Sequence, residues 1–231
     1  MNRFTIRCCR LLTLALLMTC ISIGNLTAAE TDIARPQELV DQAMATYDHF
    51  TADPEMTTFR ELLPKAQAVM IVPRLLKGGF ILGGSGGSGV LMSRDPKSGL
   101  WSYPAFYTMG SVSIGAQIGA QSSEVILIFM TAKGVDTVLA TSAKLGADIS
   151  VAAGPVGAGK GAQTADVLSF SRSKGAYGGI SAEGSVLKVR EEWNTEYYGK
   201  PVRPLDILVQ HTVSNSQANA LRVKMAHKAG E

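Results

Sequence analysis

The sequence predicts an α+β domain: one mostly antiparallel, glycine-rich β-sheet or barrel-like sandwich, with amphipathic helices before it and one helix after it. Three observations support this prediction. The chain has 231 residues, 46% of them hydrophobic, which is enough for a single sizeable core. Its 24 glycines exceed the average usage of about 7%, whereas aromatic residues make up only 6%. The spacing of apolar residues also changes from a helical period to a period of two near residue 66.

The N-terminus has the pattern of a secretory signal peptide. Arg3, Arg7 and Arg10 precede an uncharged apolar run over residues 11–29 that ends in small residues. We therefore expect cleavage after Ala29. These three arginines account for the whole formal net charge of +3, so the mature chain would be neutral. The charge balance gives no support for a nucleic-acid partner.

All three cysteines, Cys8, Cys9 and Cys20, lie in this leader. The mature chain would have no thiol for a disulfide, a metal site or a nucleophile. The alternative is a lipoprotein attached to the membrane through Cys20. Residues 17–19 fit that signal poorly, because small residues are expected just before a lipidated cysteine.

Two helices are predicted next. Over residues 36–50, Pro36 suits a first helical position and apolar residues from Leu39 to Tyr47 recur on one face. A second, short helix is predicted over residues 54–63 and ends at Pro64. We expect both to pack on a sheet, with a membrane-seeking amphipathic face as the alternative.

Strands follow. The run 68–72 is β-branched and is expected to stop at Pro73, and residues 78–93 predict a hairpin whose return strand begins at Trp101. Its glycines would let another segment pack close to the backbone. Residues 111–121 alternate without exception and predict one strand, and residues 125–130 predict a strand buried on both faces.

The rest of the chain predicts a short helix over residues 135–144, and a polar C-terminal helix over residues 214–227 with Ser214 or Asn215 as its cap. Four further strands are expected between these helices, at residues 147–153, 165–172, 176–182 and 185–190. The resulting organisation is a signal peptide (1–29), an N-terminal helical segment (30–65), a glycine-rich β core (66–210) and a C-terminal helical tail (211–231).

Three glycine-rich segments formally match catalytic or nucleotide-binding motifs. Residues 83–87 match the nucleophile elbow around Ser85, and residues 84–89 match a dinucleotide fingerprint, but the sequence after both continues as strand where a helix is required. Residues 154–160 resemble a phosphate loop, yet Gly161 stands where a Ser or Thr should bind magnesium. We therefore expect no enzymatic activity, no nucleotide and no other cofactor. Three histidines and no mature cysteine form no recognisable metal site.

A series of short segments, in one order, resembles the SYLF domain family. The segments are residues 77–80, 83–84, 89–91, 101–107, 113–119, 147–150, 154–155, 173–179 and 197–199. The similarity extends over roughly residues 36–210 and is more specific than any single glycine motif. The resemblance implies a lipid-binding domain. Eukaryotic members bind phosphoinositides or acidic phospholipids and some bind actin, whereas bacterial members are typically exported, often as lipoproteins.

The predicted function is recognition of anionic phospholipid at the surface of a bacterial cell envelope, by an exported, periplasmic or envelope-associated protein. Headgroup binding needs cations beside a groove, each contributing about 1 kcal/mol near an anionic surface. The candidates are Arg74 and Lys77 before the first glycine-rich hairpin, and Arg172 and Lys174 before the second glycine turn. These four cations could equally be solvated charges at strand ends. In that alternative the chain is a periplasmic structural or protein-interaction domain with an envelope protein as partner and no lipid ligand.

Overall fold

The computed structural model describes residues 36–79, 82–114, 119–154, 165–173, 176–179 and 182–226. The predicted leader with Cys20, Lys160 of the phosphate-loop-like segment, and Lys174 lie outside these residues. The predicted segment boundaries at residues 29 and 30 lie outside them as well.

The described chain begins with α2 (Pro36–Ala52), which has one apolar stripe. Leu39, Val40, Ala43 and Tyr47 are buried on that stripe, so it packs on the sheet as expected. The short helical segment that follows consists of η2 (Pro54–Met56), α3 (Thr57–Leu62) and η3 (Leu63–Lys65). The carboxylate of Asp53 caps its start by accepting a hydrogen bond from the backbone N–H of Glu55 at 2.8 Å. Both predicted helices are confirmed.

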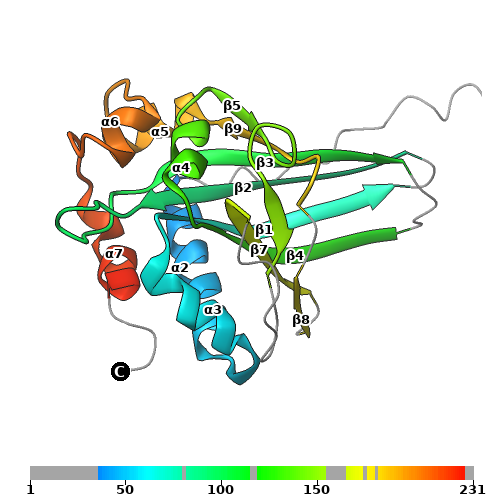
Figure 1. The fold of residues 1–231 in the computed structure, drawn as a ribbon. Helices are drawn as coiled ribbons and strands as arrows, with labels where there is room; N and C mark the ends of the chain where they lie inside the picture. Colours follow the sequence, from blue (N-terminus) through cyan, green and yellow to red (C-terminus); the bar gives the residue numbers. More distant parts are fainter. Residues whose placement is uncertain are drawn as a thin grey trace, which may run out of the picture. The chain divides into compact units, whose positions relative to one another are not determined.

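In the part of the chain that the structure describes, nine strands form one curled sheet, which confirms the predicted α+β class with a mostly antiparallel sheet (Figure 1). Their order is β5-β9-β3-β2-β1-β4-β7-β6, with β8 paired to β7. All neighbours are antiparallel except β6 and β7, which are parallel. The strands are β1 (Ala68–Gly79), β2 (Leu82–Ser93), β3 (Ala105–Ile114), β4 (Gly119–Phe129), β5 (Ser142–Lys144), β6 (Val151–Ala153), β7 (Val167–Ser173), β8 (Ala176–Gly179) and β9 (Val186–Val189).

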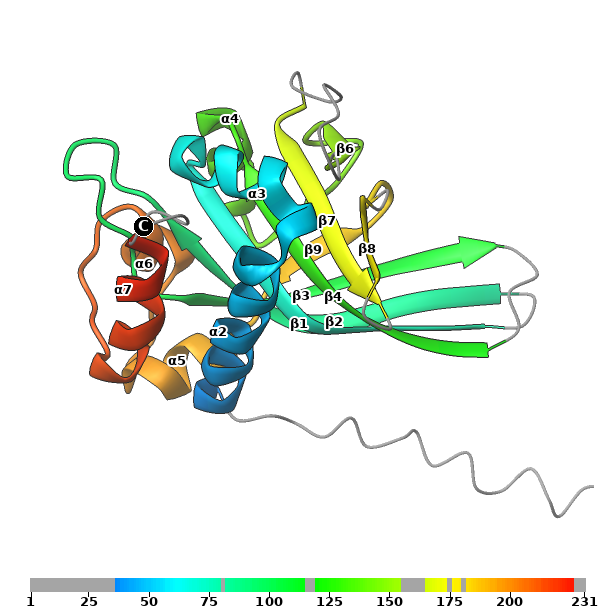
Figure 2. The same cartoon turned by 90° about the horizontal axis from the view of Figure 1, so that it is seen from below.

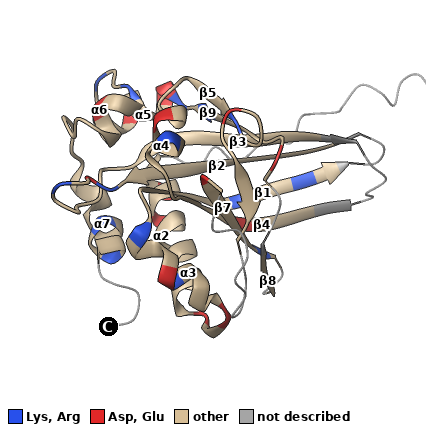
Figure 3. Ribbon diagram, viewed as in Figure 1, with Lys and Arg blue, Asp and Glu red and all other residues tan. Residues whose placement is uncertain are grey.

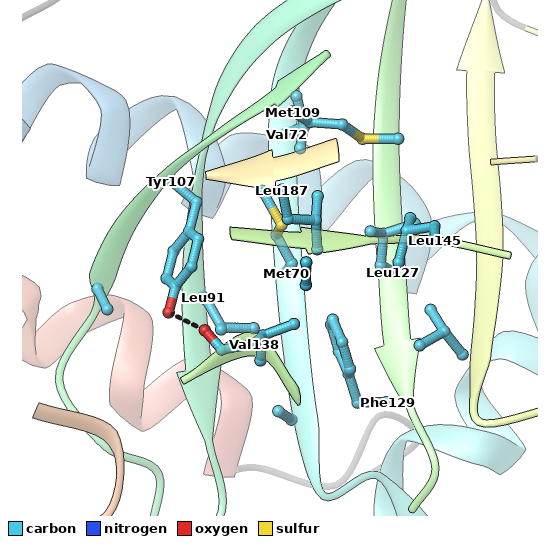
Figure 4. Close-up of a cluster of buried hydrophobic side chains, with 14 of the residues drawn as sticks. Met70, Val72, Leu91, Tyr107, Met109, Leu127, Phe129, Val138, Leu145 and Leu187 are labelled. Atoms are coloured by element: carbon cyan, nitrogen blue, oxygen red, sulfur yellow. Dashed lines mark hydrogen bonds between the residues drawn. The ribbon is translucent and has the colours of Figure 1, made fainter. Parts of the chain in front are cut away.

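The two faces of this sheet are covered by different elements. One face, here called the α2 face, packs against α2 and α3; α5 (Glu191–Tyr198) and α7 (Asn219–Ala226) lie beside α2 (Figure 2). On the opposite face, strand residues form a buried cluster with α4 (Ala132–Val138) and α6 (Pro204–Leu208). Figure 4 shows part of this cluster, in which the buried Tyr107 hydroxyl donates to the carbonyl of Val138 at 2.7 Å. Burial raises the pKa of Tyr107, which keeps the phenol protonated as a donor.

β1 does not end at Pro73, contrary to the prediction. The strand continues to Gly79. Its register against β4 shifts between Val72 and Leu75, which marks a bulge or similar irregularity around Pro73. A proline has no N–H for the sheet ladder, so a bulge is where a central strand can accept one. The bulged segment lies against β2, where a Cβ on Gly87 would be 2.4 Å from the carbonyl oxygen of Arg74. The expected close approach to glycine backbone is thereby confirmed.

Several other boundaries differ from the prediction. Residues 111–121 do not form one strand, because they are divided between β3 and β4, which β2 and β1 separate in the sheet. The predicted helix 135–144 ends early, and β5 occupies its last residues. Trp101 forms only an isolated bridge before β3.

Other features agree with the prediction. Residues 125–129 are completely buried, and Asn215 caps the C-terminal segment η4 (Ser216–Ala218) that leads into α7. Among the helices described, none is both long and apolar enough to span a bilayer.

Candidate functional site: an arginine-lined hollow beside α2

A hollow of about 480 Å³ lies between α2 and the strands β1, β4 and β7. Its volume falls within the ~300–1,000 Å³ of small-molecule sites. The residues lining it are Gln42, Ala45, Thr46, Pro73, Arg74, Ser122, Ser123, Glu124 and Arg172. Six of these nine residues carry a charge or a hydroxyl, so the hollow offers several polar groups to a ligand.

The β1 bulge brings Arg74 into the lining. Arg74 follows Pro73 directly, within the segment where β1 departs from regular pairing, and its side chain is exposed. None of the ion pairs found among the described residues includes Arg74. Its positive charge is therefore available to a ligand in the hollow.

Glu124 is the centre of a polar network on the other wall. One carboxylate oxygen accepts a hydrogen bond from Nη1 of Arg172 at 3.0 Å, and the other lies 2.9 Å from Nδ1 of His49. Thr46 donates its hydroxyl to the same carboxylate at 3.4 Å. Glu124 and Arg172 are cross-strand partners on β4 and β7, which sets this pairing by register.

The formal charges of the lining side chains add up to one positive charge. Arg172 and Glu124 offset each other, and Arg74 supplies the remainder. The hollow is thus electrostatically suited to an anion.

The structure brings together two of the four predicted cations. Arg74 and Arg172, which are 98 positions apart in the sequence, line the same hollow. Lys77 pairs with Gln121, whereas its neighbour Leu76 pairs with Ser122, which lines the hollow. Because side chains alternate along a strand, Lys77 faces the opposite side of the sheet. Lys174 lies outside the described residues.

Sequence reasoning missed Glu124, His49 and Thr46. A usable signal existed for Glu124, which follows an uncharged stretch over residues 98–123 and immediately precedes the completely buried residues 125–129. A carboxylate in that position needs a charged or hydrogen-bonding partner. His49 and Thr46 gave no comparable signal, since their contact with Glu124 depends on how α2 is oriented on the sheet.

The structure also places the catalytic-looking motifs. Ser85 lies within β2 rather than on a strand-to-helix turn, and its hydroxyl is 2.8 Å from that of Ser111 on β3. In the described part of the chain, no group of three or more His, Cys, Asp or Glu side chains is arranged to hold a metal ion.

These features define an α+β domain with an anion-compatible hollow on one face of its sheet. Residues 110–228, just over half of the chain, match the family model Ysc84, described as "Las17-binding protein actin regulator". The chain belongs to this Ysc84/SYLF family, which confirms the resemblance found in the sequence. The family description is that of a binding protein and regulator.

Several curated proteins are similar to this chain. LAS seventeen-binding protein 3 of Saccharomyces cerevisiae is 33% identical over 147 residues, which is 60% of this chain and 32% of the relative. SH3 domain-containing YSC84-like protein 1 of Homo sapiens is 31% identical over 166 residues, or 69% of this chain and 48% of the relative. The chain therefore spans about a third to a half of the length of these relatives. No solved structure matches it.

Proposed function

We propose that this chain is an exported binding module that holds the anionic headgroup of a phospholipid in the hollow beside α2, at the membrane surface of a cell envelope. One observation supports this proposal above the others. Arg74 and Arg172, both predicted from the sequence as headgroup ligands, reach one hollow from different strands.

The chemistry of the hollow fits a phosphate group. Arginine presents several N–H donors in a plane and binds phosphate oxygens with short, charge-assisted hydrogen bonds. The hydroxyls of Ser122 and Ser123 are further donors in the lining. Glu124 holds Arg172 by a direct ion pair, which would reduce the entropy lost when a ligand binds that arginine.

The predicted leader supports an envelope location. Cleavage after Ala29 would release the domain outside the membrane, whereas lipidation at Cys20 would tether it to the bilayer. Either route exposes the hollow to lipid headgroups, and neither exposes it to nucleotides or nucleic acid.

Vesicle sedimentation tests the proposal, with phosphatidylglycerol in phosphatidylcholine compared with phosphatidylcholine alone. We expect binding only to the anionic vesicles, and weaker binding at high salt, because the Debye length shortens from ~10 Å at 0.1 M to ~3 Å at 1 M ionic strength. Arg74→Glu should abolish binding without unfolding the protein, since Arg74 is exposed.

Lys77→Glu is the matched control. It makes the same change of charge on the same strand, three residues away, but on the other face of the sheet. If both replacements weaken binding equally, the protein is attracted to lipid by its general charge and the hollow is not the site.

The names of the relatives favour a second candidate, a protein-interaction domain. Las17 binding and actin regulation are properties named for the family and for those relatives. An exported chain would not meet actin, so its partner would be an envelope protein. In that case the protein should stay in the supernatant with every lipid composition, and the sedimentation assay distinguishes the two candidates.

A further inference from the structure

A floor of four glycines extends the hollow along the sheet. Gly86 pairs with Leu76 on β1 and with Gly110 on β3, and Gly84 pairs with Gly78 and Val112. Leu76 also pairs with Ser122, which lines the hollow, so this row lies on the α2 face beside the hollow. We call Gly78, Gly84, Gly86 and Gly110 the glycine floor.

Internal packing does not require glycine at two of these four positions. A Cβ on Gly78 or Gly86 would meet nothing within 4 Å. At Gly84 and Gly110 it would be in tight contact with a backbone oxygen, at 3.3 and 3.4 Å. Gly87 and Gly89 on the same strand differ, because there a Cβ would be 2.4 and 2.7 Å from a carbonyl oxygen of β1.

Glycine within a strand lowers its stability, and a common reason to retain it is the close approach of a ligand. Gly78 and Gly86, which lie on one face without an internal cause, indicate that something outside the domain lies flat on them. The geometry is therefore suited to an external molecule that packs directly against the backbone of the strands.

The surroundings of the floor are uncharged and in part apolar. Among the described residues of strands β1–β4 that lie between Arg74 and Glu124 in the sequence, Lys77 is the only charged one. Its side chain faces away from the floor. Val112 is 86% exposed and Leu76 36% exposed, and both share the face of the floor. Figures 1 and 2 show one end of strands β1–β4 extending past α2, and Figure 3 shows this end nearly free of charged residues.

We infer that the glycine floor binds the acyl chains of the same lipid whose headgroup occupies the hollow. This inference rests on the proposed function and specifies its ligand as a single amphiphile, bound by headgroup and tail. Arg74 matches the charge of the headgroup, and the floor continues from the hollow without an intervening charge. Gly78 lies four residues beyond Arg74 on β1, about 13 Å at ~3.3 Å per residue, so one lipid molecule can reach both.

Two soluble probes separate the headgroup site from the floor. Dihexanoyl phosphatidylglycerol carries both headgroup and short chains, whereas glycerol 3-phosphate carries the phosphate alone. We expect calorimetry on the purified protein to give at least about tenfold tighter binding of the dihexanoyl lipid, because each buried CH₂ group contributes ~0.8 kcal/mol. Amide signals of Gly86 and Gly110 should move in NMR spectra with the lipid and stay in place with glycerol 3-phosphate.

Gly86→Val is the decisive variant, because its Cβ has open space and valine favours a strand. It should lower the affinity for the dihexanoyl lipid to that for glycerol 3-phosphate and leave the latter unchanged. Gly178→Val on β8 is the matched control, since a Cβ there also meets nothing within 4 Å, and it should change neither affinity.

These measurements distinguish failure of the acyl-chain inference from failure of the proposed headgroup site. Equal affinities of the unaltered protein for both probes would leave the hollow as a phosphate site and overturn the inference about the floor. So would unchanged lipid binding in Gly86→Val. Binding of neither probe would overturn the proposed function and the inference together.

Discussion

Asp166 connects three separate segments through one carboxylate. It accepts hydrogen bonds from the hydroxyls of Thr131 at 2.7 Å and Ser150 at 2.6 Å, and Lys133 lies 3.6 Å away. These contacts, the Ser150 hydroxyl first and Thr131 next, lower the pKa of Asp166 to about 2. The carboxylate therefore stabilises the start of α4 and the parallel pair β6–β7 in its ionised form.

Asp166→Asn should reduce the free energy of unfolding near pH 7 by about 1 kcal/mol, a value kept small because the site is close to solvent. A pKa lowered on folding means that the stabilisation is complete above the unfolded value of ~3.9 and is lost as the pH falls toward 2. Urea unfolding at pH 7 and at pH 2.5 should therefore show a difference between the two proteins that shrinks at the lower pH. A difference that does not change with pH would show that the charge of Asp166 is not its source.

At the scale of single residues, the sequence indicated Arg74 and Arg172 because both flank glycine-rich segments. It could not show that they meet. Their meeting depends on the pairing of β1 with β4 and of β4 with β7, which joins residues about 50 positions apart. The orientation of α2 then brings Thr46 and His49 to Glu124, and no local pattern specifies that contact.

At the scale of elements, the bulge of β1 over β2 is a distinctive feature of this sheet. Gly89→Ala should destabilise the protein by about 1–3 kcal/mol, because overpacking of a tight contact forces the backbone to shift. The added Cβ would lie 2.7 Å from the carbonyl oxygen of Ile71 and 2.8 Å from Cγ2 of Val72. Urea denaturation measures the change.

Gly86→Ala is the control for that variant. It lies three residues away on the same strand with open space around its Cβ, and it should be neutral or stabilising by up to about 1 kcal/mol. Equal destabilisation by both replacements would mean that β2 needs glycine for its backbone conformation and not for its contact with β1.

The elements that sequence patterns predicted wrongly have physical causes. Pro73 usually ends a strand, but a bulge tolerates it. The alternation of apolar and polar residues over residues 111–121 continues from β3 into β4. It predicted one strand because a period of two does not reveal where the chain reverses direction. α5 went unpredicted because its eight residues are too few to display a helical period clearly. Its buried residues Trp193 and Tyr197 contact Phe106, a tertiary interaction.

At the scale of the whole molecule, the α+β class could be predicted from the amino-acid composition and from the spacing of apolar residues. Both are properties of the chain as a whole. Many glycines with few aromatic residues favour a sheet with close strand contacts, and the structure has such contacts at Gly87 and Gly89. The order of the strands could not be predicted in this way. Nothing in the local sequence shows that β1, the first strand, lies in the middle of the sheet between β2 and β4.

The mature form of the protein depends on how its N-terminal leader is processed. If the leader is a cleaved signal peptide, the intact mass of the protein recovered from its own cells should correspond to a chain starting at Glu30. The described domain begins with α2 at Pro36, so this cleavage would leave the hollow and the glycine floor complete. A diacylated chain starting at Cys20 would contradict the prediction. Lipidation would then hold the protein at the membrane independently of Arg74, and Arg74→Glu would release bound lipid without releasing the protein from the bilayer.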